Sequence, residues 1–284
     1  MDFAAPDAVP GDVRRTVDRY LDRADRLLPG RVTGFYLVGS VALGAYRPGR
    51  SDIDFVAVLD GDRDLSASDV RRLRLAHVAS GLRTASAALR RGHLMLPGTL
   101  NGVFVRAADL ARPVTAIEPL ASQVSQRFRR GGGFDVNPVQ WTTFARSGVA
   151  VRGSEPAALG LDPEPGLLRQ WNRGNLAAYW VPWAETTRRR VGPRWRAMPG
   201  WSTAWGVLGA PRLHHTIATG DVISKEAAGA WAKTVLDERF HPIVDEGLAW
   251  WRSEPGDPAL RAVDARAQAT ADLVLAIADD AGRL

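Results

Sequence analysis

The spacing of apolar residues changes once along the chain, close to the run Gly131-Gly132-Gly133. Before this run, apolar residues form short β-prone segments that alternate with helical patterns, and after it they recur at steps of three and four. The first part predicts helix, strand, strand, helix and strand, an order typical of α/β or α+β domains. The second part predicts a helical bundle. We therefore expect an α+β fold, with a sheet-containing domain followed by a helical one.

The expected elements can be bounded by residue number. In the first part, helical spacing covers 13–28 and 66–82, and the strand candidates are 32–38, 53–59 and 100–105. In the second part, helical spacing covers 139–149, 167–183, 205–218, 227–236 and 260–277. We place the domains at 1–125 and 126–284, since each is then long enough to bury a core of its own.

Composition excludes several classes of protein. The 284 residues include no cysteine, which rules out a disulfide scaffold, a thiolate zinc site and a cysteine nucleophile. No stretch approaches ~18 consecutive apolar residues, and the start Met1-Asp2-Phe3 lacks the basic residues of a secretory signal. We expect a cytoplasmic monomer with no membrane partner.

The net charge of +6 suits a nucleotide or nucleic acid partner. Only Lys225 and Lys233 among the 37 basic residues are lysines, and the others are arginines. The cluster Arg188-Arg189-Arg190 is the one feature that favours nucleic acid, but a solvated helix end explains it and no aromatic residues are interleaved with it. Nucleic acid is therefore not the expected partner.

The segment from Gly39 to Asp54 contains the residues that carry chemistry. A small Gly39-Ser40 turn after a strand lets a phosphate approach backbone N–H groups, and the serine hydroxyl adds a donor. Asp52 and Asp54, two residues apart at a strand start, share one face. Two close carboxylates repel each other unless a hard cation such as Mg²⁺ lies between them. The pattern predicts phosphoryl or nucleotidyl transfer, whereas the alternative is a strand-opening cap beside a surface aspartate.

Two motifs resemble a known family. Gly39-Ser40 followed by Ser51-Asp52-Ile53-Asp54 resembles the signature of the polymerase-β-like nucleotidyltransferase superfamily. Residues 212–220, 223–225 and 230–232, with Pro242, resemble the second half of the aminoglycoside (streptomycin/spectinomycin-type) adenylyltransferases. The resemblance covers about residues 30–255. It implies a nucleotidyltransferase domain with a small mixed sheet, a C-terminal helical bundle, and ATP as co-substrate bound with Mg²⁺ between the two.

The resemblance also implies roles for individual residues. The catalytic metal ligands are Asp52 and Asp54. The residues that contact the triphosphate are Gly39, Ser40, Ser51, Arg212 and Lys225. Trp251 falls where the family has a tyrosine beside the nucleotide base, on which an indole can also stack. Two positions that contact the aminoglycoside in the family are Ser202 and Trp205 here.

The family's third carboxylate, the general base for the acceptor hydroxyl, has no counterpart in this sequence. Its place falls on Thr99 or Asn101, which cannot accept a proton at neutral pH, and Asn101 is assigned to the acceptor site. Three alternatives stay open. The base could come from the helical part, where Glu185 is the only acidic residue between 166 and 220. The acceptor could have a hydroxyl whose pKa is already low, or the protein could be a nucleotide-binding pseudoenzyme. His93 is a further candidate base.

The charge and the tryptophan content of residues 166–220 indicate the chemical class of the acceptor. They hold eight arginines against one glutamate, and six of the ten tryptophans of the chain. A polycationic aminoglycoside is repelled by such a field, whereas a sugar-bearing, aromatic or anionic acceptor is favoured. We expect at least half of these tryptophans in the helical core. The predicted activity is transfer of AMP from ATP to a hydroxyl of a small molecule, either an antibiotic or another sugar-bearing acceptor.

Overall fold

A computed structural model describes residues 9–61, 64–90, 99–124, 127–189, 198–257, 260 and 263–284, without the side chains of 79–90 and 263–264. The chain forms two compact units, Met1–Pro165 and Gly166–Leu284. Among the helices of the described ranges, none is both long and apolar enough to cross a membrane.

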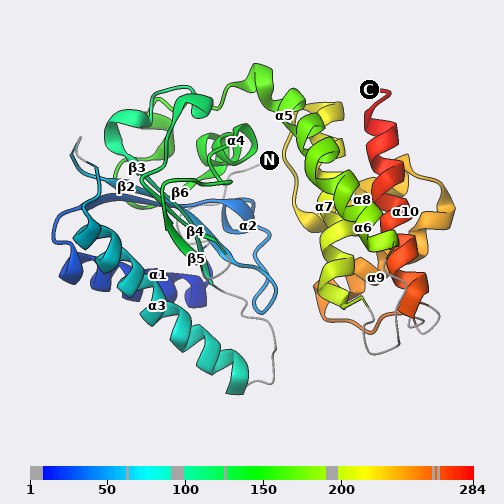
Figure 1. The fold of residues 1–284 in the computed structure, drawn as a ribbon, viewed down its shortest axis with the longest axis horizontal. Coiled ribbons are helices and arrows are strands. Elements are labelled where there is room, and N and C mark those ends of the chain that lie inside the picture. The colour runs from blue at the N-terminus through cyan, green and yellow to red at the C-terminus, as the bar shows by residue number, and fades with distance from the viewer. Residues whose placement is uncertain are drawn as a thin grey trace. The chain divides into compact units, whose positions relative to one another are not determined.

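The first unit is built on a six-stranded mixed sheet with the strand order β5-β4-β3-β2-β1-β6 (Figure 1). β2 and β3 are parallel, and the other neighbouring strands are antiparallel. The strands are β1 Val32–Leu37, β2 Ile53–Leu59, β3 Leu100–Arg106, β4 Ala121–Val124, β5 Arg127–Arg130 and β6 Val149–Arg152. The expected strands at 32–38, 53–59 and 100–105 correspond to β1, β2 and β3.

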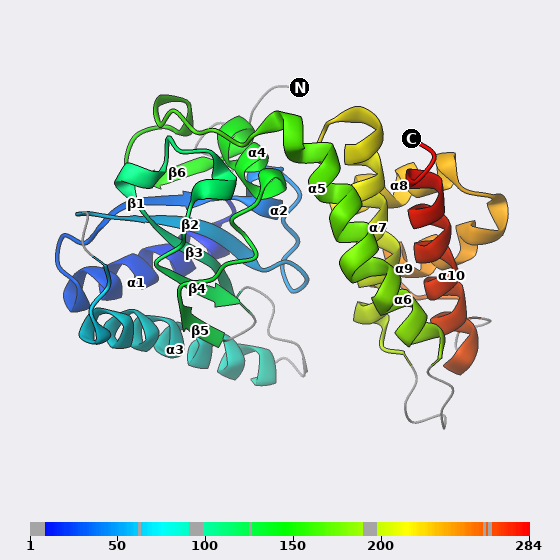
Figure 2. The same cartoon turned by 45° about the horizontal axis from the view of Figure 1, so that its top comes forward.

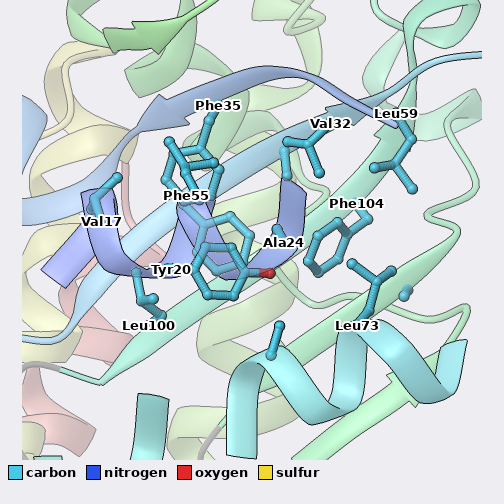
Figure 3. Close-up of a cluster of buried hydrophobic side chains, with 14 of the residues drawn as sticks. Val17, Tyr20, Ala24, Val32, Phe35, Phe55, Leu59, Leu73, Leu100 and Phe104 are labelled. Carbon is cyan, nitrogen blue, oxygen red and sulfur yellow. The ribbon is translucent and has the colours of Figure 1, made fainter. Parts of the chain in front are cut away.

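Helices α1 (Gly11–Leu27) and α3 (Ala67–Arg90) cover one face of this sheet (Figure 2). Apolar side chains of both helices meet those of β1, β2 and β3 in one buried cluster (Figure 3). Tyr20 of α1 lies against Phe35 and Phe55, with ring centroids 5.8 and 6.0 Å away. The apolar stripe at steps of three and four therefore places α1 on the sheet, as its sequence predicts.

A second apolar cluster lies on the opposite face of the sheet. Here α4 (Pro138–Ser147) packs against Tyr36, Val56 and Val103. Side chains alternate between the two faces along a strand. Asp54, two residues before Val56, therefore belongs to this face, at the end of the sheet where β2 begins.

The second unit consists of helices around its own apolar core. The helices are α5 Leu168–Asn175, α6 Val181–Arg188, α7 Gly200–Thr219, α8 Lys225–Val235, α9 His241–Arg252 and α10 Val263–Ala281. A π-helical turn at Leu176–Trp180 joins α5 to α6. His214 ties three helices together: its Nδ1 accepts a hydrogen bond from Trp231 Nε1 at 3.0 Å, and its Nε2 lies 2.8 Å from Asp280 Oδ2.

The boundary between the units differs from the expected division at 125/126. The segment 139–149, assigned from its spacing to the helical bundle, forms α4 on the first unit instead. The chain then enters β6, where Val149 pairs with Leu37 of β1, and this pairing holds α4 on the sheet. The compact units therefore divide after Pro165.

Candidate active site

Asp52 and Asp54 lie where β2 begins. Ile53 between them is buried among the side chains beneath α1 and α3, so both carboxylates belong to the opposite face. The N–H of Ile53 donates to the carbonyl of Thr99 at 2.9 Å. The N–H of Val38 donates to the carbonyl of Asp54 at 3.0 Å. These bonds to β3 and to the end of β1 fix the backbone that carries the two carboxylates.

Both oxygens of the Asp52 carboxylate accept hydrogen bonds from neutral side chains of the neighbouring chain segment. Thr99 Oγ1 donates to Oδ1 at 2.8 Å. Asn101 Nδ2 donates to Oδ2 at 3.0 Å. The place expected to hold a third carboxylate therefore supplies donors that orient Asp52, and neither donor can act as a general base.

Helix α2 (Gly39–Ala42) begins directly after β1, against Asp54. Gly39 has a φ of +59°, and a Cβ at this position would overlap the Asp54 carboxylate. Both constraints require glycine. Ser40 Oγ is buried and has no hydrogen-bond partner within the described part of the chain. Because an unpaired buried hydroxyl is costly, this one fits a ligand group that accepts a hydrogen bond.

The carboxylate pair fits a hard divalent cation. Mg²⁺ is commonly held by one or two carboxylates together with substrate phosphates and water. In the described ranges, no group of three or more His, Cys, Asp or Glu side chains could enclose a metal. Asp52 and Asp54 could therefore hold Mg²⁺ together with phosphate oxygens and water, and a phosphate there could accept a hydrogen bond from the Ser40 hydroxyl.

The loop between α2 and β2 is closed by Ser51. Its Oγ accepts a hydrogen bond from the N–H of Arg47 at 3.0 Å, and its N–H donates to the Arg47 carbonyl at 2.9 Å. Ser51 thus fixes the chain just before Asp52. In the same loop, Tyr46 donates to Asp12 Oδ2 at 3.1 Å. Burial raises the pKa of Tyr46, and the negative charges of Asp12 and Asp52 raise it further, so Tyr46 is a neutral donor here.

In the second unit, Lys225 lies over two indole rings. Its Nζ is 4.4 Å from the ring centroid of Trp251 and 5.7 Å from that of Trp205. Both distances permit cation–π attraction. Arg212, also expected at the phosphates, donates from Nε to the Ile223 carbonyl at 3.0 Å, just before α8. The structure therefore brings Lys225, Trp205 and Trp251 together, as neighbours on three helices.

Trp205 belongs to an exposed aromatic patch formed by Tyr179, Trp201 and Trp205. These side chains are 44%, 44% and 40% exposed, respectively. Trp205 Nε1 donates to Tyr179 Oη at 3.1 Å, and its ring stacks on that of Trp180 with centroids 5.5 Å apart. Ser202 lies half-buried on the same helix, α7. The patch offers ring faces and one hydroxyl to a ligand.

Two family comparisons cover these two groups of residues. Residues 17–89 match the nucleotidyltransferase domain, and residues 188–276 match the aminoglycoside adenylyltransferase C-terminal domain. The chain is a polymerase-β-like nucleotidyltransferase of the adenylyltransferase family. In this adenylyltransferase-family enzyme, the first match contains Asp52 and Asp54, and the second contains Arg212, Lys225 and Trp251.

Among solved structures, the spectinomycin adenyltransferase AAD(9) from Enterococcus faecialis with ATP and spectinomycin is similar to this nucleotidyltransferase. It matches with a TM-score of 0.65 and 12% identity, over 92% of this chain and 99% of that one, so the fold is shared. The STING-associated CdnE c-di-GMP synthase from Capnocytophaga granulosa covers 100% of this chain and 84% of its own, at 11% identity. Its TM-score of 0.28 is too low to inform the fold. No curated protein matches the chain.

The structure bears on three predictions about the helical unit of this nucleotidyltransferase: its candidate base, its positive charge and the tryptophan expected beside the nucleotide base. Glu185, a candidate base, forms an ion pair with Arg189 at 3.3 Å on the exposed side of α6. Arg188 pairs with Asp272 at 3.3 Å, so part of the expected positive field is balanced by α10. Trp251 is only 4% exposed, which does not fit the predicted stacking on a nucleotide base. Of the residues that this positive, tryptophan-rich segment contributes, Arg190, Arg194, Trp195 and Arg196 lie outside the described residues, and so does the candidate base His93 of the first part of the chain.

Tyr179 was not expected at the site from the sequence. The signal was present, since Tyr179 stands beside Trp180 and four residues before Trp183. Helical spacing alone would separate Tyr179 and Trp180 onto different faces, and Trp180 is the buried one. The hydrogen bond to Trp205 became visible only with the packing of α7 against the π-helical turn.

Proposed function

We propose that this nucleotidyltransferase transfers AMP from ATP to a hydroxyl of a small molecule, with Asp52 and Asp54 as ligands of Mg²⁺. The observation that carries the proposal is the carboxylate of Asp54 against Gly39, next to the Ser40 hydroxyl, which has no hydrogen-bond partner among the described residues. In the reaction, the acceptor oxygen bonds to the α-phosphorus. The bond from that phosphorus to the oxygen bridging to the β-phosphate breaks, pyrophosphate leaves with the electron pair, and the hydroxyl proton is released.

Each residue of the sheet site has a distinct part in this proposal. Bound Mg²⁺ supplies positive charge that neutralises the phosphate oxygens during in-line displacement. Thr99 and Asn101 hold Asp52 in one orientation, and Ser40 donates to a phosphate oxygen. Gly39 leaves room for the Asp54 carboxylate to lie against the start of α2.

In the helical unit, we assign Arg212 and Lys225 to the triphosphate, because a cation paired with a phosphate forms a strong charge-assisted hydrogen bond. Support comes from their place in the second family match and from the indoles that position the Lys225 ammonium. Trp251 then acts through Lys225, since its burial leaves no open face for a nucleotide base.

For the acceptor, we propose a sugar-bearing or aromatic molecule that contacts Ser202 and the aromatic patch. Exposed indole and phenol rings bind sugar and aromatic faces with little loss of side-chain entropy. The similar structure of AAD(9) contains spectinomycin, which makes antibiotics one class of acceptor to test. Several arginines and few carboxylates in 166–220 disfavour a polycation.

One observation favours a second candidate, a nucleotide-binding protein without transfer activity. Thr99 and Asn101 both donate to Asp52, so the place of the family's base is filled by groups that cannot take a proton. In that case ATP with Mg²⁺ binds and no acceptor receives AMP.

The test incubates the purified chain with α-³²P-labelled ATP, Mg²⁺ and a panel of spectinomycin, neutral sugars, sugar phosphates and phenols. The proposal predicts a labelled acceptor and pyrophosphate, both lost in Asp54→Asn. Asp18→Asn, on the exposed side of α1, is the matched control and should keep activity. Binding of ATP with no labelled product across the panel would support the second candidate, especially if Asn101→Glu gained turnover.

A further inference from the structure

The face of the sheet that carries Asp54 continues across three more strands. Asp54 pairs with Asn101 of β3, and at the far edge Val124 of β4 pairs with Arg127 of β5. Gly102 pairs with Gln123, so the next step of the same antiparallel register sets Asn101 opposite Val124. Cross-strand neighbours share a face, so one row runs from Asp54 to Arg127.

The contacts of Phe128 confirm which face β5 presents. Its ring lies 5.5 Å from that of His77 and 6.1 Å from that of Phe104, on the side covered by α3. Because side chains alternate along a strand, Arg127 and Arg129 belong to the other face. That is the face of Asp54.

This stretch of the sheet is open and positively charged. Val124 is 39% exposed, and Arg127 and Arg129 are exposed. Within the described ranges, no carboxylate forms an ion pair with either arginine. Neighbouring strands lie about 4.8 Å apart, so three steps set the Arg127 backbone about 14 Å from that of Asp54. The long side chain of Arg127 reaches part of this distance, so its guanidinium could contact one end of an acceptor whose other end lies near Asp54.

The position of Gly39 and Ser40 fixes the side from which an acceptor approaches. Both residues follow β1, which borders β2 on one side, whereas β3, β4 and β5 lie on the other. In an in-line displacement the nucleophile and the leaving pyrophosphate are on opposite sides of the α-phosphorus. Phosphates held at Ser40 therefore leave β3 to β5 as the acceptor's side.

The geometry points to an acceptor that is an anion, with a hydroxylated body over Asn101 and Val124 and a phosphate or carboxylate group bound by Arg127. This inference rests on the proposed transfer of AMP and names its substrate class. The arginine fork matches both anions in a bidentate manner. The hydroxyl oxygen attacks as described above, and the anionic group keeps its bonds and its charge throughout. A polycation at this end of the row would face Arg127 and Arg129, neither of which forms an ion pair with a carboxylate of the described ranges.

The experiment measures binding by calorimetry with Mg²⁺ and a non-hydrolysable ATP analogue, so that it remains readable even if no transfer occurs. The probes are monosaccharide phosphates, the matching uronic acids, their neutral parents, and spectinomycin. We expect a sugar phosphate or a uronic acid to bind at least about tenfold more tightly than its neutral parent, which corresponds to ~1.4 kcal/mol. Whichever of the two probes, the sugar phosphate or the uronic acid, binds more tightly identifies the anionic group that Arg127 recognises.

The variant Arg127→Glu should remove this preference. The matched control is Arg72→Glu, on the exposed side of α3 against the opposite face of the sheet, which should keep it. Equal binding of anionic and neutral sugars, including no binding of either, overturns the inference. Tighter binding of spectinomycin than of every anionic probe by the native chain overturns it as well. Failure of AMP transfer itself appears separately, as no labelled product from any acceptor.

Discussion

Asn101 of β3 donates a hydrogen bond from Nδ2 to Asp52 Oδ2 at 3.0 Å. Thr99 Oγ1 donates a second hydrogen bond, to the other oxygen of the same carboxylate. Thr99 and Asn101, the two positions at which a third carboxylate is expected, therefore do more than lack a base, since both support the residue that we propose as a metal ligand. Groups that orient a metal ligand commonly change metal affinity about 10- to 100-fold when they are removed.

The first prediction concerns this support. Asn101→Leu and Thr99→Val should each weaken Mn²⁺ binding in the presence of ATP by about tenfold or more, because Asp52 loses one orienting donor. Bound Mn²⁺ is counted by electron paramagnetic resonance. Thr99→Ser keeps the hydroxyl and should keep most of the affinity. Unchanged Mn²⁺ binding in both apolar variants would show that Asp52 needs no support.

The second prediction concerns Gly39. Gly39→Ala places a Cβ against the Asp54 carboxylate and strains a backbone of φ +59°, so ATP affinity should fall sharply. Gly30→Ala is the matched control: its φ is +69°, but a Cβ there meets nothing within 4 Å. Both variants should lose about 1–2 kcal/mol of unfolding free energy from left-handed strain, and only Gly39→Ala should lose nucleotide binding. Equal ATP affinity in the two variants contradicts the assignment.

The third prediction compares the two lysines of the chain. Lys225→Met removes the ammonium held over Trp205 and Trp251, and ATP affinity should fall about tenfold or more, as expected for the loss of a charged hydrogen bond of ~1.5–3 kcal/mol. Lys233→Met breaks an ion pair with Asp245 on the surface and should leave ATP affinity unchanged. Calorimetric titration with ATP and Mg²⁺ measures both. A similar effect of the two substitutions would argue against a nucleotide role for Lys225.

The fourth prediction concerns stability and pH. His77 is buried beside Tyr20 Oη at 3.0 Å, and burial lowers the pKa of His77 from 6.5 to about 3. Protons therefore bind the unfolded chain more readily, so this contribution to stability is complete above pH 6.5 and is lost as the pH falls toward 3. Between pH 6.5 and pH 5 the loss should be ~1.6 kcal/mol.

Urea unfolding at the two pH values measures this loss. His77→Gln keeps a polar partner for Tyr20 but cannot be protonated in this range, so its unfolding free energy should depend less on pH. An identical pH dependence in the variant and the native chain would mean that other groups control acid unfolding.

The sequence predicted the parts of the fold in which local pattern and packing agree. β1, β2 and β3 are apolar runs, and the aspartates between Ser51 and Phe55 share a face because side chains alternate along a strand. β5, with the sequence Arg127-Phe128-Arg129-Arg130, has too little apolar character to be found by pattern, and it exists because β4 pairs with it. Its face, and with it the position of Arg127, follows only from the register of the sheet.

Other features depend on tertiary contacts that no local pattern contains. Trp250 and Trp251 are adjacent in the sequence, and only the packing of α9 buries Trp251 beneath Lys225. The hydrogen bonds from Thr99 and Asn101 to Asp52 join positions almost fifty residues apart, so the sequence could identify the missing carboxylate but not what replaces it.

The central claim is that Asp52 and Asp54 hold a divalent cation against the triphosphate of ATP. Its most direct test is the calorimetric affinity for ATP, measured with and without Mg²⁺, in the native chain and in the variants Asp52→Asn, Asp54→Asn and Asp18→Asn. The account predicts that Mg²⁺ tightens ATP binding in the native chain and in Asp18→Asn, and that this gain disappears in the other two variants. A full Mg²⁺-dependent gain in Asp54→Asn would contradict it.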